Sequence, residues 1–336
     1  MAHEAHFYQP EEEQAVSCAL CAHRCRIAAG ARGICGVREN DGGVLTSLVY
    51  GMVIAENTDP IEKKPLFHVL PGSRSFSIAT AGCNFRCAFC QNHEISQLPR
   101  EKGRIAGRKR TPAQIVEDAI RSGSRSIAYT YTEPTIAFEF AYDTAGIARE
   151  KGLQNIFVTN GYMTGEMLEL IAPRLDAANV DLKAFRDDFY RIQCGARLQP
   201  VLDNLRKMKE LGIWIEVTTL LIPDLNDGDQ ELRDIARFIL SFGTETPWHI
   251  SRFHPRYRMR DKPTTTAAAL HRAAEIGKSI GLNHVYRGNL PGDPGENTFC
   301  ARCGRLLIAR TGFAVERMDL KDSGCPRCGT PLAGIF

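Results

Sequence analysis

The sequence predicts an α/β fold built on parallel strands, arranged as a barrel that is either complete or partial. The first observation is that short apolar segments alternate with longer segments of helical periodicity, which is typical of parallel sheets. The second is size, because 336 residues with 43% hydrophobic content suffice for one large domain with small appendages. The third is the grouping of most of the twelve cysteines into sets at the two ends and after the first strand.

The alternating region contains six predicted strands and a last short apolar segment. The strands are expected at 75–79, 126–130, 155–159, 178–182, 213–221 and 248–251, and the last segment at 284–286. In a barrel of this kind the chemistry lies in the loops that follow the strands. We therefore look for functional residues directly after each of these segments.

The helices between the strands carry recognisable start and stop signals. One helix is expected to begin at Thr111-Pro112, because threonine is a good N-cap and proline fits the first helical position. The next is expected to end near Gly152. Asp227 and Gln230 predict a capping box for the helix that follows the fifth strand.

The loop after the first predicted strand carries three cysteines, Cys83, Cys87 and Cys90, at CxxxCxxC spacing. Three thiolates at this spacing can bind a four-iron cluster, and the missing fourth ligand leaves one iron open for substrate. An aromatic residue, Phe89, precedes the last cysteine. A bare CxxC pair would fit a structural zinc knuckle equally well.

The C-terminal cysteines form two CxxC pairs on either side of a predicted hairpin. Two such knuckles place four thiolates at tetrahedral distance, which suits zinc or, in rubredoxin-like sites, a single iron. The sequence therefore predicts a structural zinc ribbon on Cys300, Cys303, Cys325 and Cys328.

A third set of cysteines lies near the N-terminus, in a segment rich in glycine, arginine and polar residues. Such a segment is unsuited to burying free thiols as hydrophobes, so metal binding is the better interpretation. The set fits zinc or an auxiliary iron–sulfur cluster, with His23 as an alternative ligand, and we expect zinc. The candidate ligands are Cys18, Cys21, Cys25 and Cys35.

With its preceding strand and Phe89, the central cysteine loop resembles that of radical S-adenosylmethionine (SAM) enzymes. The resemblance implies a partial (β/α)6 TIM-type barrel and a [4Fe–4S] cluster on the three cysteines. It also implies that the open iron of that cluster chelates the amino and carboxylate groups of SAM. Cys83, Cys87 and Cys90 are then the catalytic residues.

The same resemblance assigns residues at the strand ends to SAM. The family's Gly-Gly-Glu-Pro motif corresponds to Tyr-Thr-Glu-Pro here, in which Glu133 is implied as the acceptor for the methionyl amine and Thr132 retains a hydroxyl. Val158-Thr-Asn-Gly resembles the Asp-Thr-Asn-Gly of pyruvate formate-lyase activating enzymes, without the aspartate that helps to bind a cation there.

Two further matches lie at later strands, an Asp-Leu-Lys motif and a histidine that the resemblance places near the adenosyl group. The implied cofactor-binding residues are Phe89, Thr132, Glu133, Thr159, Asn160, Asp181, Lys183 and His254.

The combined pattern resembles the radical SAM member of the AmmeMemoRadiSam system, which is related to pyruvate formate-lyase activating enzymes. It includes both terminal cysteine sets, the run 59–65, Cys194-Gly and the run 288–292. The expected domains are a cysteine-containing module and connector at 1–74, the barrel at 75–295 and a zinc-ribbon or rubredoxin-like module at 296–336. The resemblance implies a flavodoxin- or ferredoxin-like reductant and Memo-like and Ammecr-like partners, but no substrate.

The implied activity is reductive cleavage of SAM to methionine and a 5′-deoxyadenosyl radical, which abstracts hydrogen from a substrate that the sequence does not identify. One alternative is a glycyl-radical-enzyme activase, which takes hydrogen from a glycine of a partner protein. Another is a metal-binding interaction protein without turnover.

Composition and charge exclude other classes. A net charge of +3 gives no reason to expect nucleic acid as a partner, and no apolar run is long enough to span a membrane. The N-terminus is polar and lacks the apolar stretch of a signal peptide. Cysteines that bind metal fit a reducing compartment, so we expect a cytoplasmic protein.

Two features of the sequence each allow two interpretations. The run 59–65, charged and bracketed by prolines, either folds over the barrel mouth and contacts substrate or is a solvated connector. Cys194 is either a thiol that faces substrate or a small buried hydrophobe.

Overall fold

In the computed structural model, which describes residues 3–336, one nine-stranded sheet lies at the centre of the molecule. Seven of its strands are parallel. The order of these seven strands across the sheet is the same as their order along the chain. They agree with the predicted segments to within two residues at each end. They are β8 (Arg74–Thr80), β10 (Ser126–Tyr129), β11 (Gln154–Thr159), β12 (Ala177–Asp181), β13 (Trp214–Leu221), β14 (Trp248–Arg252) and β15 (Val285–Gly288).

The sheet is open, and two antiparallel strands extend it beyond β8. β7 (Met52–Pro60) pairs with β8, and the short β9 (Arg108–Lys109) pairs with β7, so that β15 and β9 form the two edges. The connector that precedes the first parallel strand is therefore part of the central sheet.

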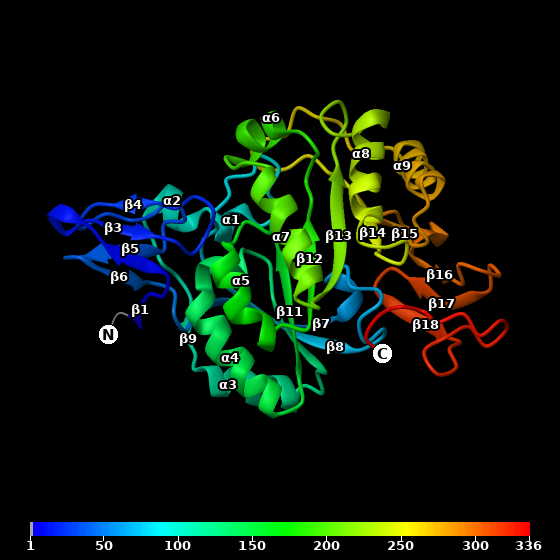
Figure 1. Cartoon of the computed structure of the whole chain (residues 1–336), viewed down its shortest axis with the longest axis horizontal. Coiled ribbons are helices and arrows are strands. Elements are labelled where there is room, and N and C mark those ends of the chain that lie inside the picture. The colour runs from blue at the N-terminus through cyan, green and yellow to red at the C-terminus, as the bar shows by residue number, and fades with distance from the viewer. Residues whose placement is uncertain (1–2) are drawn as a thin grey trace.

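The helices that connect the parallel strands pack on the sheet (Figure 1). The longer ones are α3 (Pro112–Arg121), α4 (Phe138–Glu150), α5 (Gly165–Ile171), α7 (Gln199–Glu210), α8 (Asp229–Leu240) and α9 (Ala267–Ile280). The short helices are α1 (His93–Ser96), α2 (Leu98–Lys102) and α6 (Asp187–Phe189), and a π-helical turn follows at Tyr190–Cys194. Short 3₁₀ turns lie at Glu12–Gln14, Ile61–Lys63, Pro134–Ala137, Ala172–Arg174 and Pro294–Glu296.

One predicted helix start is confirmed and another is wrong. Thr111 caps α3 and forms a reciprocal capping box with Gln114. At α8 the N-cap is Gly228, which has no side chain to cap with. Asp227 lies one residue too early, and its carboxylate instead accepts a hydrogen bond from the backbone N–H of Asp224.

The N-terminal segment forms two small antiparallel sheets on one flank of the molecule (Figure 1). One consists of β1 (His3–Glu4), β6 (Val44–Ser47) and β5 (Arg38–Asp41), and the other of β2 (Tyr8–Pro10), β3 (Val16–Cys18) and β4 (Arg26–Ile27). A buried ion pair of 2.5 Å between Arg38 and Glu139 ties this flank to α4.

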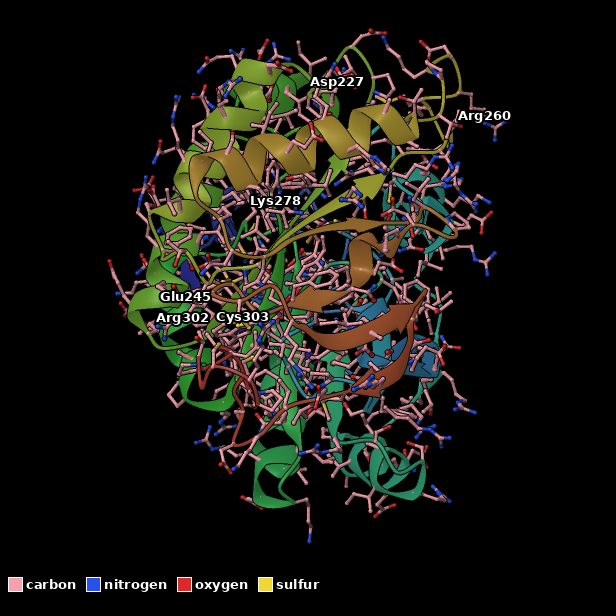
Figure 2. The ribbon with its side chains drawn as sticks, turned by 90° about the vertical axis from the view of Figure 1, so that its right-hand side faces the viewer. Asp227, Glu245, Arg260, Lys278, Arg302 and Cys303 are labelled. Atoms are coloured by element: carbon pink, nitrogen blue, oxygen red, sulfur yellow. The ribbon has the colours of Figure 1, made fainter. Side chains whose placement is uncertain are left out.

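The C-terminal segment lies on the opposite flank, next to β15 (Figure 1). Its sheet consists of β16 (Thr298–Phe299), β17 (Leu306–Thr311) and β18 (Ala314–Met318). A second view shows α9 running along the sheet (Figure 2). In the same view Cys303, in the C-terminal segment, is well separated from Arg260, in the loop after β14. Within residues 3–336 we find no helix with the length and apolar character needed to cross a membrane.

Candidate active site

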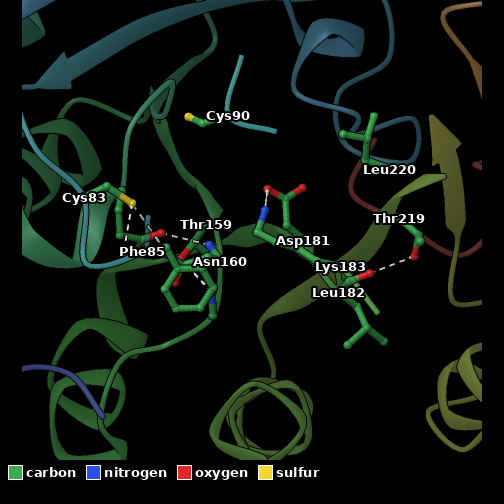
Figure 3. A network of polar contacts seen from close by, with 12 residues as sticks. Cys83, Phe85, Cys90, Thr159, Asn160, Asp181, Leu182, Lys183, Thr219 and Leu220 are labelled. Atoms are coloured by element: carbon green, nitrogen blue, oxygen red, sulfur yellow. Dashed lines mark hydrogen bonds and ion pairs between the residues drawn. The ribbon is translucent and has the colours of Figure 1, made fainter. Parts of the chain in front are cut away.

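A cavity of about 520 Å³ lies at the carboxyl ends of the parallel strands. All three central cysteines line it, as do all but one of the residues expected to bind the cofactor. The expected residues that line it are Cys83, Cys87, Phe89, Cys90, Thr132, Glu133, Thr159, Asn160, Asp181 and Lys183. Figure 3 shows Cys83, Thr159 and Asn160 on one side of this group and the Asp181–Lys183 pair on the other.

The loop that carries the cysteines follows β8 and is held in place by the π-helical turn. The backbone N–H groups of Arg86 and Ala88 donate to the carbonyl groups of Cys194 and Gln193, at 2.9 and 2.8 Å. The Sγ of Cys83 accepts from the backbone N–H of Phe85 at 3.3 Å. Backbone hydrogen bonds of this kind fix where the thiolates point before any metal arrives.

Cys194 itself is fully buried and does not line the cavity. Its thiol lies beside the sulfur of Cys87 and lowers the pKa of the Cys87 thiol. The structure therefore agrees with the buried interpretation of Cys194 and not with a thiol that faces substrate.

Glu133 joins two of the loops at the strand ends. Its Oε1 accepts from the hydroxyl groups of Thr135 and Thr159, both at 2.6 Å, and its Oε2 accepts from the backbone N–H of Asn160 at 2.8 Å. Burial raises the pKa of Glu133, although the hydrogen bonds from these donors favour the charged form and lower it. Since a carboxylate has about four acceptor positions, most of its capacity is used within the protein. Glu133 thus positions Thr159 and Asn160 and leaves an unused acceptor position on Oε2.

Asn160 extends from this network to the cysteine loop. Its side-chain amide donates to Oδ1 of Asn84 at 2.7 Å and lies 3.9 Å from the Sγ of Cys83. On the other side of the cavity, Nζ of Lys183 pairs with Asp181 at 2.9 Å and lies 5.8 Å from the centre of the Phe89 ring. Glu133 and Asn160 therefore face the cysteine loop from one side of the cavity, and the Lys183–Asp181 pair faces it from the other.

The run 59–65 does line the cavity, through Glu62, Lys63, Lys64 and Pro65. Lys64 is 1% exposed, pairs with Asp59 at 2.5 Å and lies 4.7 Å from the centre of the Tyr131 ring. Burial lowers the pKa of Lys64 to about 8, against the attraction of Asp59. Burial opposes ionisation of Asp59 as well, yet hydrogen bonds from Lys64 and Tyr131 keep its pKa well below the usual range.

His254 is exposed and is not among the residues that line the cavity. A different histidine, His249 on β14, occupies the wall, and its Nε2 contacts Glu216 at 2.6 Å. Burial opposes ionisation of Glu216, but the His249 contact lowers its pKa to about 2. The sequence interpretation missed both residues, although a glutamate within a buried strand is a recognisable signal.

The four C-terminal thiols come together as expected. Their sulfur atoms all lie within 4.8 Å of one another. Among residues 3–336, no other group of three or more His, Cys, Asp or Glu side chains brings its ligand atoms so close together. The Sγ atoms of Cys300 and Cys328 are 3.5 Å apart, and those of Cys303 and Cys325 are 3.6 Å apart. Zinc–sulfur bonds of about 2.3 Å in a tetrahedron place the sulfurs about 3.8 Å apart, so this set fits one zinc ion.

The four N-terminal cysteines line a second, separate cavity of about 10 Å³. Within the described chain, no three of them have their sulfurs all within 4.8 Å of one another. The zinc that we expected at this set therefore lacks the close thiol spacing seen at Cys300 to Cys328, and it stays a prediction.

The central cysteines also stand wider apart than ligands of one ion, as a cluster of several irons requires. Three thiols, a hydrogen-bonded Asn160 and a Lys183–Asp181 pair on one cavity suit a negatively charged cluster together with a zwitterionic ligand. On its donor set the site fits a [4Fe–4S] cluster and SAM.

Comparison with known proteins supports this chemistry. The sequence profile of the radical SAM superfamily matches residues 77–239. An uncharacterized protein of Methanocaldococcus jannaschii is 46% identical over 332 residues, which cover 98% of each chain. Residues 77–239 form a radical SAM domain.

The relatives include a pyruvate formate-lyase-activating enzyme of Clostridium pasteurianum, 24% identical over 176 residues, or 50% of this chain and 70% of that one. Among solved structures, a radical SAM methyltransferase from Sphaerobacter thermophilus is similar in fold, with a TM-score of 0.51 and 17% identity. The match covers 70% of this chain and 71% of that one. The chain is accordingly an enzyme of the superfamily, whose fold implies a [4Fe–4S] cluster and SAM.

Proposed function

We propose that this enzyme binds a [4Fe–4S] cluster on Cys83, Cys87 and Cys90 and cleaves SAM reductively in the 520 Å³ cavity. The observation that carries the proposal is that three thiols and the expected SAM residues from three other strand ends line one cavity. When bound, the cluster and SAM supply methionine and a 5′-deoxyadenosyl radical, which abstracts hydrogen from the substrate.

The protein's own residues would orient SAM and keep water out. Oε2 of Glu133 has an acceptor position for the methionyl ammonium, and Asn160 is fixed beside Cys83. Lys183 offers a cation for a carboxylate, and its ion pair with Asp181 fixes where it lies. The His249 ring is buried against Glu216 and supplies a rigid wall.

We further propose three parts: an N-terminal cysteine-containing module and connector at 1–74, a partial barrel at 75–295 and a zinc-ribbon or rubredoxin-like module at 296–336. The open parallel sheet supports the partial (β/α)6 barrel, and the spacing of Cys300 to Cys328 supports zinc. The sequence pattern supports a place in the AmmeMemoRadiSam system. On that basis we propose Memo-like and Ammecr-like partners, a flavodoxin- or ferredoxin-like reductant and a cytoplasmic location.

The test is anaerobic reconstitution with iron and sulfide, followed by reduction and measurement of 5′-deoxyadenosine released from SAM. We expect release by the wild type and none by a variant in which Cys83, Cys87 and Cys90 are all alanine. A matched control is the Cys303→Ser variant, which alters a different thiol site and should still cleave SAM. Absence of 5′-deoxyadenosine from reconstituted wild type would exclude the proposed reaction.

A glycyl-radical-enzyme activase is the second candidate, because relatives of this chain carry that name. It differs from the first proposal only in substrate, which would be a glycine of a large partner protein. The cavity walls formed by Lys63, Lys64 and Phe313 argue for a smaller substrate.

A further inference from the structure

The N-terminal cysteines belong to one buried site that the reaction described above does not use. Cys18, Cys21 and Cys35 are at most 9% exposed, and together with Cys25 they line the second cavity. The remaining wall is largely apolar and comes from Leu20, Ile27, Ile34 and Ile136. Four thiols that face one apolar space without forming disulfides are typical of a metal centre.

Spacing decides which kind of metal centre fits. The C-terminal set shows how this chain arranges thiols for a single ion, with sulfur–sulfur distances of 3.5 and 3.6 Å. The N-terminal thiols converge on one cavity but stand farther apart, as the central three also do. An iron–sulfur cluster spreads its thiolates more widely than one ion does, because each binds an iron at a different corner.

One buried cation lies at the site. Arg38 lines the cavity, is 1% exposed, and its Nε has no hydrogen-bond partner among the described residues. A cation beside the thiolates stabilises an anionic cluster and tunes its reduction potential.

The site also contacts the loop that carries the catalytic cysteines. His23 hydrogen-bonds through Nε2 to the backbone carbonyl of Asn84 at 2.8 Å. The guanidinium of Arg100 donates to the carbonyl groups of both Ile34 and Cys83, at 2.7 and 3.2 Å. A Cβ added to Gly82 would lie only 3.3 Å from the carbonyl oxygen of Cys35. Each of these contacts joins the segment of the N-terminal cysteines to residues 82–84 of the catalytic loop.

We propose that Cys18, Cys21, Cys25 and Cys35 bind an auxiliary iron–sulfur cluster that passes electrons to the cluster on Cys83, Cys87 and Cys90. The relay role rests on the proposed function, whereas the auxiliary cluster itself does not. One electron moves from a reduced low-potential donor of the flavodoxin or ferredoxin class to the auxiliary cluster, and then to the catalytic cluster. The donor is oxidised by one electron, and neither transfer breaks a bond.

The first experiment uses the full chain with Cys83, Cys87 and Cys90 all replaced by alanine, reconstituted anaerobically with iron and sulfide. This variant has no catalytic cluster, and a single iron at Cys300 to Cys328 would bring no inorganic sulfide. Bound sulfide, together with an equal amount of iron, therefore reports on the N-terminal site whether or not the protein cleaves SAM. We expect iron and sulfide in equal amounts, two or four of each per chain depending on cluster type. We also expect an electron paramagnetic resonance (EPR) signal of the reduced cluster that does not change when SAM is added.

Absence of bound sulfide from that variant would overturn the proposal, as would a second zinc ion beyond the one at Cys300 to Cys328. The reciprocal variant is Cys18→Ser with Cys21→Ser. It should lose the auxiliary iron and keep the EPR signal that responds to SAM. If serine at these positions prevents folding, the first variant alone decides whether the site binds a cluster.

The relay role has its own measurement. Reduction of the catalytic cluster by reduced flavodoxin is followed by rapid-freeze EPR in the wild type and in the Cys18→Ser, Cys21→Ser variant. We expect at least about a tenfold slower reduction in the variant and, with the small reductant dithionite, an unchanged rate of SAM cleavage. If the double variant folds, equal rates with flavodoxin would remove the relay role while leaving the cluster assignment intact.

Discussion

At the residue scale, Glu133 shows how a single buried carboxylate joins two of the loops that line the cavity. It connects the loop after β10 to the loop after β11 by accepting from Thr135, Thr159 and Asn160. A glutamine in its place keeps the shape but replaces one acceptor oxygen by an amide that donates. One of those donors, or the SAM ammonium, then loses its acceptor.

We therefore expect Glu133→Gln to retain the cluster but to bind SAM about ten- to a hundredfold more weakly, because a charge-assisted hydrogen bond contributes roughly 1.5–3 kcal/mol. Anaerobic equilibrium dialysis with SAM measures the affinity, and iron content checks the cluster. Glu166→Gln, an exposed position on α5, is the matched control and should bind SAM normally. Equal affinities for the two variants would show that Glu133 is not part of the SAM site.

Lys63 and Lys64 offer an internal comparison, since both pair with Asp59 but only one is buried. The Lys64 side chain is 1% exposed and that of Lys63 is 44% exposed. Removing Lys64 leaves the buried Asp59 carboxylate with only the partly exposed Lys63 as its cation, whereas an exposed pair contributes little. We expect Lys64→Met to lower the free energy of unfolding by about 3 kcal/mol, and Lys63→Met by less than about 1 kcal/mol. Urea denaturation of the zinc-loaded protein provides both values, and similar losses would contradict this account.

The two histidines on and after β14 show what the sequence could and could not predict about the site. His254 fitted a family motif, but the chain has left the strand by that point and the side chain is exposed. His249 and Ser251 alternate with the buried Trp248 and Ile250, and both line the cavity. Period-two alternation within the strand was the better guide. The cysteine loop and Glu133 were predictable because their order along the chain fixes their place at the strand ends.

At the scale of elements, the parallel strands were predictable because each is a short apolar segment between helical ones. The antiparallel β7 was not, since its sequence Met-Val-Ile-Ala-Glu-Asn-Thr-Asp-Pro ends in polar residues that resemble a connector. Its pairing with β8 is a tertiary contact that local pattern does not encode. That pairing brings the run 59–65 to the cavity wall.

The C-terminal module is fixed to this wall by one buried arginine. Arg310 on β17 donates to the carbonyl oxygen of Phe67 at 2.7 Å and lies 3.5 Å from Glu62, and both side chains of the ion pair are fully buried. Burial raises the pKa of Glu62, with Arg310 as its opposing charge. Without Arg310 the carboxylate would lie in the interior with no cation beside it.

We expect Arg310→Met to destabilise the protein by about 3–5 kcal/mol, because it leaves Glu62 buried and unpaired. Limited proteolysis should then cut between β15 and β16, while zinc stays bound, because the four cysteines belong to a different part of the module. Arg317→Met on β18 is the control, since that side chain is 70% exposed. Identical cleavage patterns for the two variants would mean that Arg310 does not anchor the module.

At the scale of the whole molecule, the two terminal modules lie on opposite flanks of the sheet and have different relations to the cavity (Figure 1). The N-terminal module contacts the loop that carries the cysteines, and the C-terminal module contributes Glu296 and Phe313 to the cavity wall. The sequence indicated both modules by their cysteine spacing. It gave no indication of which one lies next to the catalytic loop, because that depends on contacts between residues far apart along the chain.

This arrangement bears on the substrate. Lys63, Lys64 and Phe67 line the cavity from a segment that is held by the buried contacts of Asp59, Glu62 and His68. A glycine-bearing loop of a large folded enzyme would have to displace this segment and Phe313 to reach the cysteines, and the broken buried pairs would oppose that movement. We therefore expect that the substrate is not a standard glycyl-radical enzyme. The reduced protein and SAM, incubated with candidate glycyl-radical enzymes, should give no glycyl-radical doublet by EPR while 5′-deoxyadenosine is still formed. Pyruvate formate-lyase with its own activating enzyme is the positive control, and a stoichiometric doublet with this chain would establish it as an activase instead.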